Sequence, residues 1–316
     1  MVKKPVSERT YVLILAGGEG VRFTPYSTSR KPKQFLPITH PKRTMIQETC
    51  ERMLRLVPPE RCLVSTNKEY IPLVKEQLRQ IPSSNIIGEP FRKNTAPAIA
   101  LAGAIVASRD RDAVLVAAPS DHLIEKTGEY GEYIDIMRRA IALADSEKSP
   151  LILGITPNHP SQEYGYIKRG KKRPDGAFEV DRFVEKPDRK SAVKYIREGC
   201  YFWNSGMFVW RTDVLMRLIK KHAPDIASCA LKLKIEDGIV DQDSLCVFFN
   251  ESPGISIDRA LMEKIDRAIV LPLDVGWSDV GGWEIVAKLY ASGKISPPKE
   301  VIDCLNEESN RAKERG

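Results

Sequence analysis

A short apolar run near the start of the chain ends in a glycine-rich turn, and this turn limits the folds that the chain can adopt. The run is Tyr11–Leu15, and residues 16–20 (AGGEG) form the turn. Glycines allow backbone N–H groups to approach an anion without an intervening side chain. Two cations follow, Arg22 and Lys33, and they can bind a polyphosphate as a planar fork and as a point charge. We therefore interpret the segment as the triphosphate-binding turn of an enzyme.

Two other phosphate-binding motifs fit the sequence less well. A dinucleotide fingerprint requires G-x-G-x-x-G and an acidic residue about 20 positions further on. Here Phe23 takes the place of the third glycine, and residues 35–45 contain no Asp or Glu. A P-loop requires G-x-x-x-x-G-K-[ST], and residues 165–172 nearly match it, but Lys172 replaces the required hydroxyl. For the first glycine turn taken alone, a plain strand-to-helix connection is the alternative.

The composition and charge narrow the class of protein. The 316 residues, 42% hydrophobic and 29% charged, suit one large α/β domain. The formal net charge of +7 suits polyanionic small substrates, and we interpret the basic stretch 168–173 as a solvated loop rather than a nucleic-acid contact. The six cysteines show no C-x-x-C pair, which is typical of a reducing compartment. Without a signal peptide or a membrane-length apolar run, we expect a cytoplasmic protein with no membrane partner.

Apolar runs alternate with segments of helical periodicity. This pattern predicts an α/β fold with a Rossmann-like, mixed, mostly parallel sheet flanked by helices. The expected strands are 11–15, 62–66, 86–87, 113–118, 151–155, 206–210 and 268–273, with extended segments within 164–186. The expected helices are 44–58, 67–80, 94–108, 130–144, 213–222 and 283–290. Residues 291–316 are polar and lack periodicity, so we expect a C-terminal tail after one domain of residues 1–290. The sequence leaves a homodimer open.

Two aspartates follow predicted strands and are candidate metal ligands. Asp121 comes after strand 113–118, and Asp279 comes after strand 268–273. Ligands of open α/β sheets bind beyond the carboxyl ends of the strands, so the two carboxylates can converge beside the glycine turn. Mg²⁺ requires few protein carboxylates when phosphate and water oxygens complete its shell. For each aspartate alone, a helix N-cap is the alternative. We interpret the neighbouring His122 as a structural hydrogen-bonding residue.

The second half of the chain carries residues suited to a sugar phosphate. Lys186 can bind a second anion. The alternative interpretation of this lysine is a surface ion pair with Glu185. Residues 164–166 and 201–206 combine aromatic rings with glycines and an amide. Such rings can lie on the C–H faces of a sugar while Asn204 and Glu185 bond its hydroxyls. For the aromatic side chains of 202–203, filling of the core is the alternative.

Taken together, these segments resemble the bacterial mannose-1-phosphate guanylyltransferases, within the sugar nucleotidyltransferases. The similarity extends from about residue 11 to residue 290. The matching stretches, in order, are AGGEGVR (16–22), PKQFLP (32–37), KNTAPA (93–98), PSDH (119–122), EYGYI (163–167), FVEKP (183–187), WNSGMFVW (203–210), SIDRALME (256–263) and WSDVGGW (277–283). Each stretch is weak evidence alone, but nine in the same order are a specific pattern.

The resemblance implies a role for individual residues. Catalytic cations would be Arg22, Lys33 and Lys186. Contacts to the nucleotide GTP would come from Ala16, Gly17, Gly18, Gly20, Glu89, Asn94, Thr95 and Ser120. The sugar phosphate would be held by Gly165, Glu185, Lys186 and Asn204, and Mg²⁺ by Asp121 and Asp279.

The implied reaction joins GTP and α-D-mannose 1-phosphate to give GDP-mannose and pyrophosphate. Thr24 stands where the family usually has Trp, Thr28 where it has Arg, and Lys93 where it has Arg, which leaves the rate and the nucleotide contacts of that loop open. Many relatives also carry an isomerase domain of the cupin type, which we do not expect here. Two alternatives are a related enzyme with another pair, such as glucose 1-phosphate with UTP or ATP, and a catalytically weak regulatory homologue.

Overall fold

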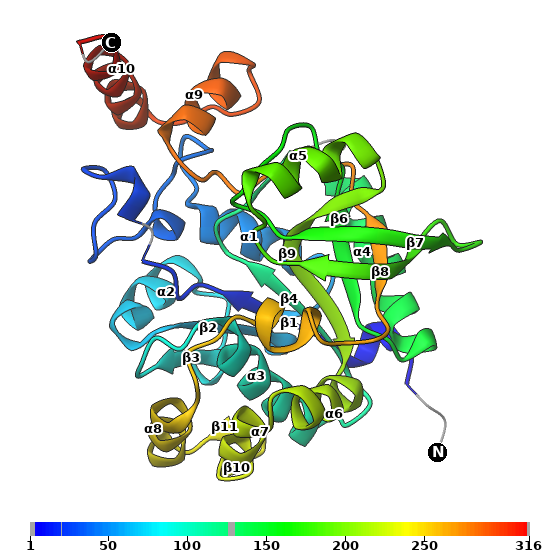
Figure 1. The fold of residues 1–316 in the computed structure, drawn as a ribbon. Helices are drawn as coiled ribbons and strands as arrows, with labels where there is room; N and C mark the ends of the chain where they lie inside the picture. The colour runs from blue at the N-terminus through cyan, green and yellow to red at the C-terminus, as the bar shows by residue number, and fades with distance from the viewer. Residues whose placement is uncertain (1–3, 20, 126–129, 315–316) are drawn as a thin grey trace.

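A computed structural model describes residues 4–19, 21–125 and 130–314, and these residues form a mixed sheet with helices on both faces (Figure 1). The nine strands of the sheet are β1 (Thr10–Leu15), β2 (Cys62–Asn67), β3 (Ile86–Glu89), β4 (Val114–Pro119), β6 (Leu151–Ile155), β7 (Tyr166–Lys172), β8 (Phe178–Val184), β9 (Tyr201–Arg211) and β12 (Ile269–Pro272). Their spatial order is β3-β2-β1-β4-β9-β6-β12-β8-β7.

The strand directions confirm the expected fold class. β1 is parallel to both β2 and β4, and β12 is parallel to β6. By contrast, β9 is antiparallel to β4 and β6, and β8 is antiparallel to β12 and β7. The sheet is therefore mixed and mostly parallel, with β8 and β9 running against the other strands.

Ten α-helices are assigned among the described residues. They are α1 (Met45–Met53), α2 (Ile71–Gln77), α3 (Thr95–Arg109), α4 (Gly131–Glu147), α5 (Arg189–Glu198), α6 (Thr212–His222), α7 (Pro224–Ala230), α8 (Gln242–Glu251), α9 (Trp283–Ala291) and α10 (Lys299–Glu314). A capping box of Thr44 and Gln47 marks the start of α1. In the described part of the chain, none of the helices has both the length and the apolar character needed to cross a membrane.

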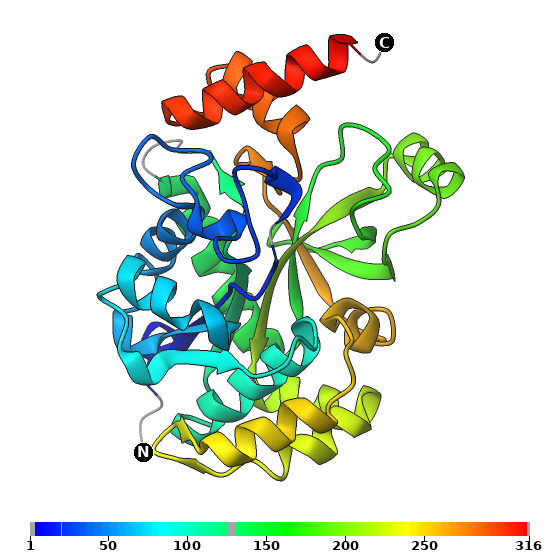
Figure 2. The same cartoon turned by 90° about the vertical axis from the view of Figure 1, so that its left-hand side faces the viewer.

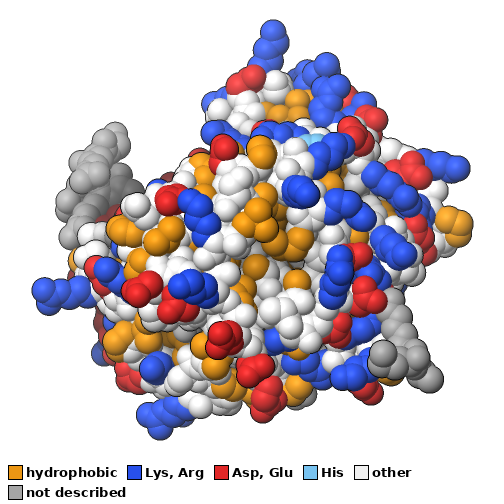
Figure 3. Space-filling model, turned by 90° about the horizontal axis from the view of Figure 1, so that it is seen from below, with side chains coloured by type: hydrophobic (Ala, Val, Ile, Leu, Met, Phe, Trp, Pro, Cys, Tyr) orange, Lys and Arg blue, Asp and Glu red, His pale blue; other side chains and the backbone are white. Residues whose placement is uncertain are grey.

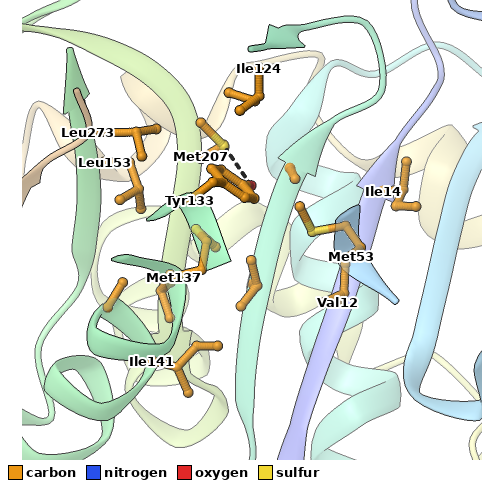
Figure 4. Close-up of a cluster of buried hydrophobic side chains, with 14 of the residues drawn as sticks. Val12, Ile14, Met53, Ile124, Tyr133, Met137, Ile141, Leu153, Met207 and Leu273 are labelled. Atoms are coloured by element: carbon orange, nitrogen blue, oxygen red, sulfur yellow. Dashed lines mark hydrogen bonds between the residues drawn. The ribbon is translucent and has the colours of Figure 1, made fainter. Parts of the chain in front are cut away.

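The central strands are apolar on both faces because a layer of helices covers each face. Val12 and Ile14 of β1 pack in a cluster with residues of α1, α2 and α4, as Figure 4 shows in part. Leu13, between them, packs on the other face with residues of α3, α6, α7 and α8. This alternation is the two-residue period of a strand, and burial on both faces explains the continuous apolar run.

Helix α3 is rich in Ala and Gly and packs closely against α6. A Cβ atom on Gly103 would lie 2.9 Å from Leu215 Cδ2 of α6 and 3.1 Å from the sulfur of Met216. Real side chains essentially never come so close to such a carbon. The glycine therefore leaves room for the Leu215 and Met216 side chains against α3.

Strand β9 is longer than expected and joins two parts of the sheet. Its residues Phe208–Arg211 pair with β4, whereas Tyr201–Trp203 pair with β7. Phe202 and Trp203 are 6% and 3% exposed, so these rings fill the core, which was the alternative to a role in sugar binding.

The segment after Ser292 differs from the expected irregular tail. It contains α10, which lies with α9 at one end of the molecule (Figure 2). Val301 and Leu305 are buried in a third cluster with Phe23, Leu36 and Val286. Val301 and Leu305 lie about one turn apart, and the charged residues around them obscured this short apolar period in the sequence. The pattern also did not predict α5, α7 or α8; α5, for example, buries only Ala192.

Substitution of a core residue in β4 tests whether the central strands are buried on both faces of the sheet. Leu115 is fully buried, and Leu115→Ala should lower the free energy of unfolding by about 3 kcal/mol. Leu231 is 89% exposed, and Leu231→Ala should change it by less than about 0.5 kcal/mol. Urea denaturation of the two variants measures both values. Equal effects would contradict the assignment of Leu115 to the core.

Candidate active site

Lys33 lies at the centre of the residues that the sequence singled out. It begins a short 3₁₀ turn, Lys33–Phe35, and is only 5% exposed. Its Nζ donates to Asp121 Oδ2 at 3.1 Å and to the main-chain oxygen of Asp279 at 2.6 Å. A buried ammonium group requires hydrogen-bond partners, and these two acceptors bind two of its three protons. Both candidate metal ligands are thus brought beside one cation.

A small antiparallel ladder brings the two aspartates together. Strand β5 (Leu123–Ile124) follows Asp121, and strand β13 (Trp277–Ser278) precedes Asp279. The two strands pair with Ser278 opposite Leu123. The ladder therefore places Asp279 beside the segment that carries Asp121.

The charges around Asp121 hold it ionised. Burial raises the pKa of its carboxyl, but the charges of Lys33 and His122 and the hydrogen bonds that it accepts together lower it more, so that the net pKa lies below the ordinary value. Burial also lowers the pKa of His122. Trp277 Nε1 donates to His122 Nδ1 at 3.2 Å, so that the imidazole acts as a structural acceptor, as expected.

A glutamine that the sequence analysis did not single out fixes the glycine turn. Gln34 Nε2 donates to the carbonyl oxygens of Ala16 and Gly18, at 3.0 and 2.8 Å. Thr66 Oγ1 also donates to the Ala16 oxygen, at 2.9 Å. The side chain next to Lys33 therefore sets the path of the turn. The one indication of Gln34 in the sequence was its position next to Lys33 in the stretch 32–37. Gly20 lies outside the described residues.

A cavity of about 530 Å³ opens beside this turn. The sequence-predicted residues that line it are Gly17, Gly18, Glu89, Asn94, Thr95 and Asp121. Ser65 Oγ donates to Glu89 Oε1 at 2.7 Å, and Ile257 N donates to Thr95 Oγ1 at 2.9 Å. Ala16 and Ser120 do not line this cavity and are buried, at 1% and 2% exposure.

A second cavity, of about 370 Å³, adjoins the first. Arg22, Lys33, Asp121 and Asp279 line it, and Asp121 lines both cavities. Arg22 is well exposed, and its guanidinium forms a surface ion pair with Glu163 at 3.6 Å. The two cations expected at the triphosphate and the two expected metal ligands thus line the same cavity.

The expected sugar-phosphate residues form a separate group. A Cβ atom on Gly165 would lie 2.7 Å from Glu185 Oε2, and Asn204 N donates to the Gly165 oxygen at 2.8 Å. Lys186 Nζ lies 3.5 Å from Glu185 Oε1, with more than half of the lysine side chain exposed.

A hairpin brings Glu185 to this group. Strand β8, which ends just before Glu185, runs antiparallel to β7, with Val184 opposite Tyr166. The hairpin therefore returns Glu185 to the start of β7, beside Gly165.

Asp258 joins the sugar-phosphate group, although the sequence analysis gave it no role. Its Oδ1 accepts from Asn204 Nδ2 at 2.8 Å, while Asn204 Oδ1 accepts from Gly206 N at 3.0 Å. These bonds fix the orientation of the amide. Burial raises the pKa of Asp258. Burial, followed by the charge of Asp258, also raises the pKa of Glu185. The SIDRALME segment was the only signal for Asp258.

Comparison with known proteins assigns the chain to a family. A family model described as "Nucleotidyl transferase" matches residues 11–291. The chain belongs to the nucleotidyl transferase family. Alginate biosynthesis protein AlgA of Pseudomonas fluorescens is 40% identical over 288 residues, which are 88% of this chain and 57% of that protein. Mannose-1-phosphate guanylyltransferase of Escherichia coli is 42% identical over 278 residues, 86% of this chain and 58% of that protein.

A solved structure agrees with this fold. The crystal structure of mannose-1-phosphate geranyltransferase from Thermus thermophilus superimposes with a TM-score of 0.80 and 31% identity. The match covers 90% of this chain and 79% of that one. The chain spans about 57–61% of the length of the first curated relatives that it matches.

The buried carboxyl group of Glu89 predicts a pH-dependent stability. Burial raises its pKa above the ordinary 4.5, although the Ser65 hydrogen bond acts in the opposite direction. As the pH rises above 4.5, ionisation of Glu89 is less favourable in the folded state than in the unfolded state, so the free energy of unfolding decreases. Glu89→Gln should raise Tm at pH 7, and this gain should vanish below pH 4.5, where both states bind the proton.

The control for this prediction is the exposed Glu76, for which Glu76→Gln should change Tm little at either pH. Thermal denaturation across the pH range measures both variants. If the Tm gain of Glu89→Gln persisted below pH 4.5, the buried charge of Glu89 would not be its cause.

Proposed function

We propose that this protein transfers GMP from GTP to α-D-mannose 1-phosphate, giving GDP-mannose and pyrophosphate. The observation that carries the proposal is the convergence of Lys33, Asp121 and Asp279 beside the glycine turn. Relatives at about 40% identity are named mannose-1-phosphate guanylyltransferase, including those of Klebsiella pneumoniae and Escherichia coli. Those names support the choice of sugar and nucleotide for this chain.

Nucleotide binding is assigned to the larger cavity. The triphosphate would lie along Gly17 and Gly18, whose missing side chains let the backbone come close to an anion. The guanosine would lie toward Glu89, Asn94 and Thr95, which line the same cavity. A basic surface is not required for this chemistry, and Figure 3 shows acidic and basic side chains interspersed over one face.

The main obstacle to the reaction is the approach of one anion to another. A phosphate oxygen of the sugar phosphate would attack the α-phosphorus in line, and pyrophosphate would leave. At 4 Å each pair of unit charges repels by roughly 4 kcal/mol at an effective dielectric constant of 20. Arg22 and Lys33 would offset this charge on the triphosphate, and Lys186 on the sugar phosphate. Catalysis would then consist of positioning and electrostatic stabilisation.

The carboxylates of Asp121 and Asp279 suit a divalent cation, which we propose to be Mg²⁺. Both line the smaller cavity, and carboxylate oxygens are the ligands that this ion prefers. Among the side chains that the structure describes, no three His, Cys, Asp or Glu residues are grouped to hold a metal. Phosphate and water oxygens would therefore supply the other ligands. When bound, the cation neutralises charge on the phosphates.

Sugar binding is assigned to the group around Gly165. Glu185 and Asn204 present a carboxylate and an amide with a fixed orientation. A sugar hydroxyl can donate to the first and accept from the second. The exposed Lys186 would bind the 1-phosphate.

The test is release of pyrophosphate from GTP with mannose 1-phosphate and Mg²⁺. Glucose 1-phosphate, UTP and ATP serve as alternative substrates, and EDTA removes the cation. We expect rapid, EDTA-sensitive release with GTP and mannose 1-phosphate. Release of pyrophosphate only with another sugar phosphate or another nucleotide would support the same reaction with different substrates. No release from folded protein that binds GTP would indicate a regulatory homologue instead.

Replacement of Lys33 tests its catalytic role separately. Lys33→Ala should lower kcat by about 10²–10³-fold, the usual effect of removing one transition-state donor, while circular dichroism stays unchanged. Lys31, two residues earlier and exposed, is the matched control, and Lys31→Ala should keep kcat. Near-normal turnover by Lys33→Ala would contradict the assigned role.

A further inference from the structure

Tyr164 holds the carboxylate of Asp279. Its hydroxyl donates to Asp279 Oδ1 at 2.9 Å. Lys33 binds the main-chain oxygen of Asp279 rather than its carboxylate. Within the described ranges, Tyr164 is therefore the one donor seen at that carboxylate. The phenol ring comes from the segment before β7, 115 residues away in the sequence.

Aromatic contacts fix the position of the Tyr164 hydroxyl. The ring packs edge-to-face on Trp203 with centroids 4.8 Å apart, and on Trp277 with centroids 5.3 Å apart. Trp203 is buried, and Trp277 is bonded through Nε1 to His122. A ring held on two sides loses little further freedom when its hydroxyl bonds the carboxylate.

The other oxygen of Asp279 lies against a glycine. A Cβ atom on Gly281 would come within 3.0 Å of Asp279 Oδ2, a distance that real Cβ contacts rarely reach. One carboxylate oxygen is thus bonded to Tyr164, and the other has space that a side chain at Gly281 would take. The arrangement fixes the direction in which Oδ2 is offered.

We propose that Tyr164 is a positioning residue that orients the Asp279 carboxylate toward the divalent cation. The inference rests on the proposed function, because that function assigns the cation to Asp121 and Asp279. Carboxylates that bind metals are themselves held by hydrogen bonds, and loss of such a partner typically costs about 10–100-fold in metal affinity or activity.

Tyr164 also connects the cation site to the sugar-phosphate group. The next residue, Gly165, accepts a backbone hydrogen bond from Asn204 at 2.8 Å and faces Glu185. A single dipeptide therefore holds Asp279 through its side chain and Asn204 through its backbone. This fixes the distance between the proposed cation ligand and the proposed sugar ligands.

The test compares Tyr164→Phe with the wild type in Mn²⁺ binding, measured by electron paramagnetic resonance in the presence of GTP. The variant keeps the ring and loses only the hydroxyl. We expect Mn²⁺ affinity to fall by about tenfold, with Tm and GTP affinity in EDTA unchanged. Saturating Mn²⁺ should restore most of kcat, because a positioning residue does not touch the substrate.

The matched control is Tyr166→Phe. The Tyr166 hydroxyl is buried and bonds both the N–H and the carbonyl oxygen of Ser161, each at 3.0 Å. Its loss should lower Tm and leave Mn²⁺ affinity at the wild-type value. Asp279→Asn gives the reference for a lost ligand and should bind Mn²⁺ most weakly.

Two results would overturn the inference. One is wild-type Mn²⁺ affinity in Tyr164→Phe, and the other is an equal loss of affinity in both tyrosine variants, which would indicate a merely structural effect. A wild-type protein that binds no Mn²⁺ with GTP would instead overturn the proposed cation site itself, so the two failures are distinguishable.

Discussion

The buried ammonium group of Lys33 is the interaction on which the site depends. A charge removed from water is tolerated only with good partners, and its partners come from residues 88 and 246 positions away in the sequence. Asp121 is delivered by the end of β4, and Asp279 by the β5–β13 ladder. Lys33 thus links the segment after β1 to the β5–β13 ladder. Without correct pairing of both segments, the cation would have no place in the core.

The C-terminal helices contribute to this arrangement from the opposite side. Phe23 and Leu36, which flank Lys33 in sequence, are buried in the same cluster as Val286 of α9 and Val301 of α10. The Phe23 ring packs edge-to-face on Trp283 at 5.0 Å, and the Lys33 ammonium lies 6.0 Å from that phenylalanine ring. Residues after 280 therefore hold the loop that carries the cation. This makes α9 and α10 part of the support of the site rather than an appendage.

Much of the fold could be predicted from the sequence because its signals are local. The strands of the central sheet are apolar runs, and the start of α1 is marked by its own capping residues. The rule about strand ends predicted that Asp121 and Asp279 would meet, although the β5–β13 ladder that brings them together was not predicted. Helix α10 could not be foreseen, since charged residues surround its buried Val301 and Leu305 in the sequence. The direction of β8 also escaped prediction, because it depends on pairing with β7 and not on the composition of β8.

The residues missed at the site share one property: each acts through another residue. Gln34 bonds the backbone of the glycine turn, and Asp258 bonds the Asn204 amide. Tyr164 was expected only as a ring that could lie on a sugar, and its bond to Asp279 was missed. Their side chains are ordinary in sequence, and their importance arises only from distances between remote segments. Motif spacing indicates which residues meet a ligand, whereas the structure indicates which residues hold them.

The most direct test is the position of a cation and a triphosphate in crystals grown with Mn²⁺ and GTP. Anomalous scattering at the manganese edge locates the metal independently of the protein atoms. The account predicts one manganese between the carboxylates of Asp121 and Asp279, with the triphosphate along Gly17 and Gly18. A manganese bound elsewhere, or a triphosphate remote from the glycine turn and Lys33, would contradict it.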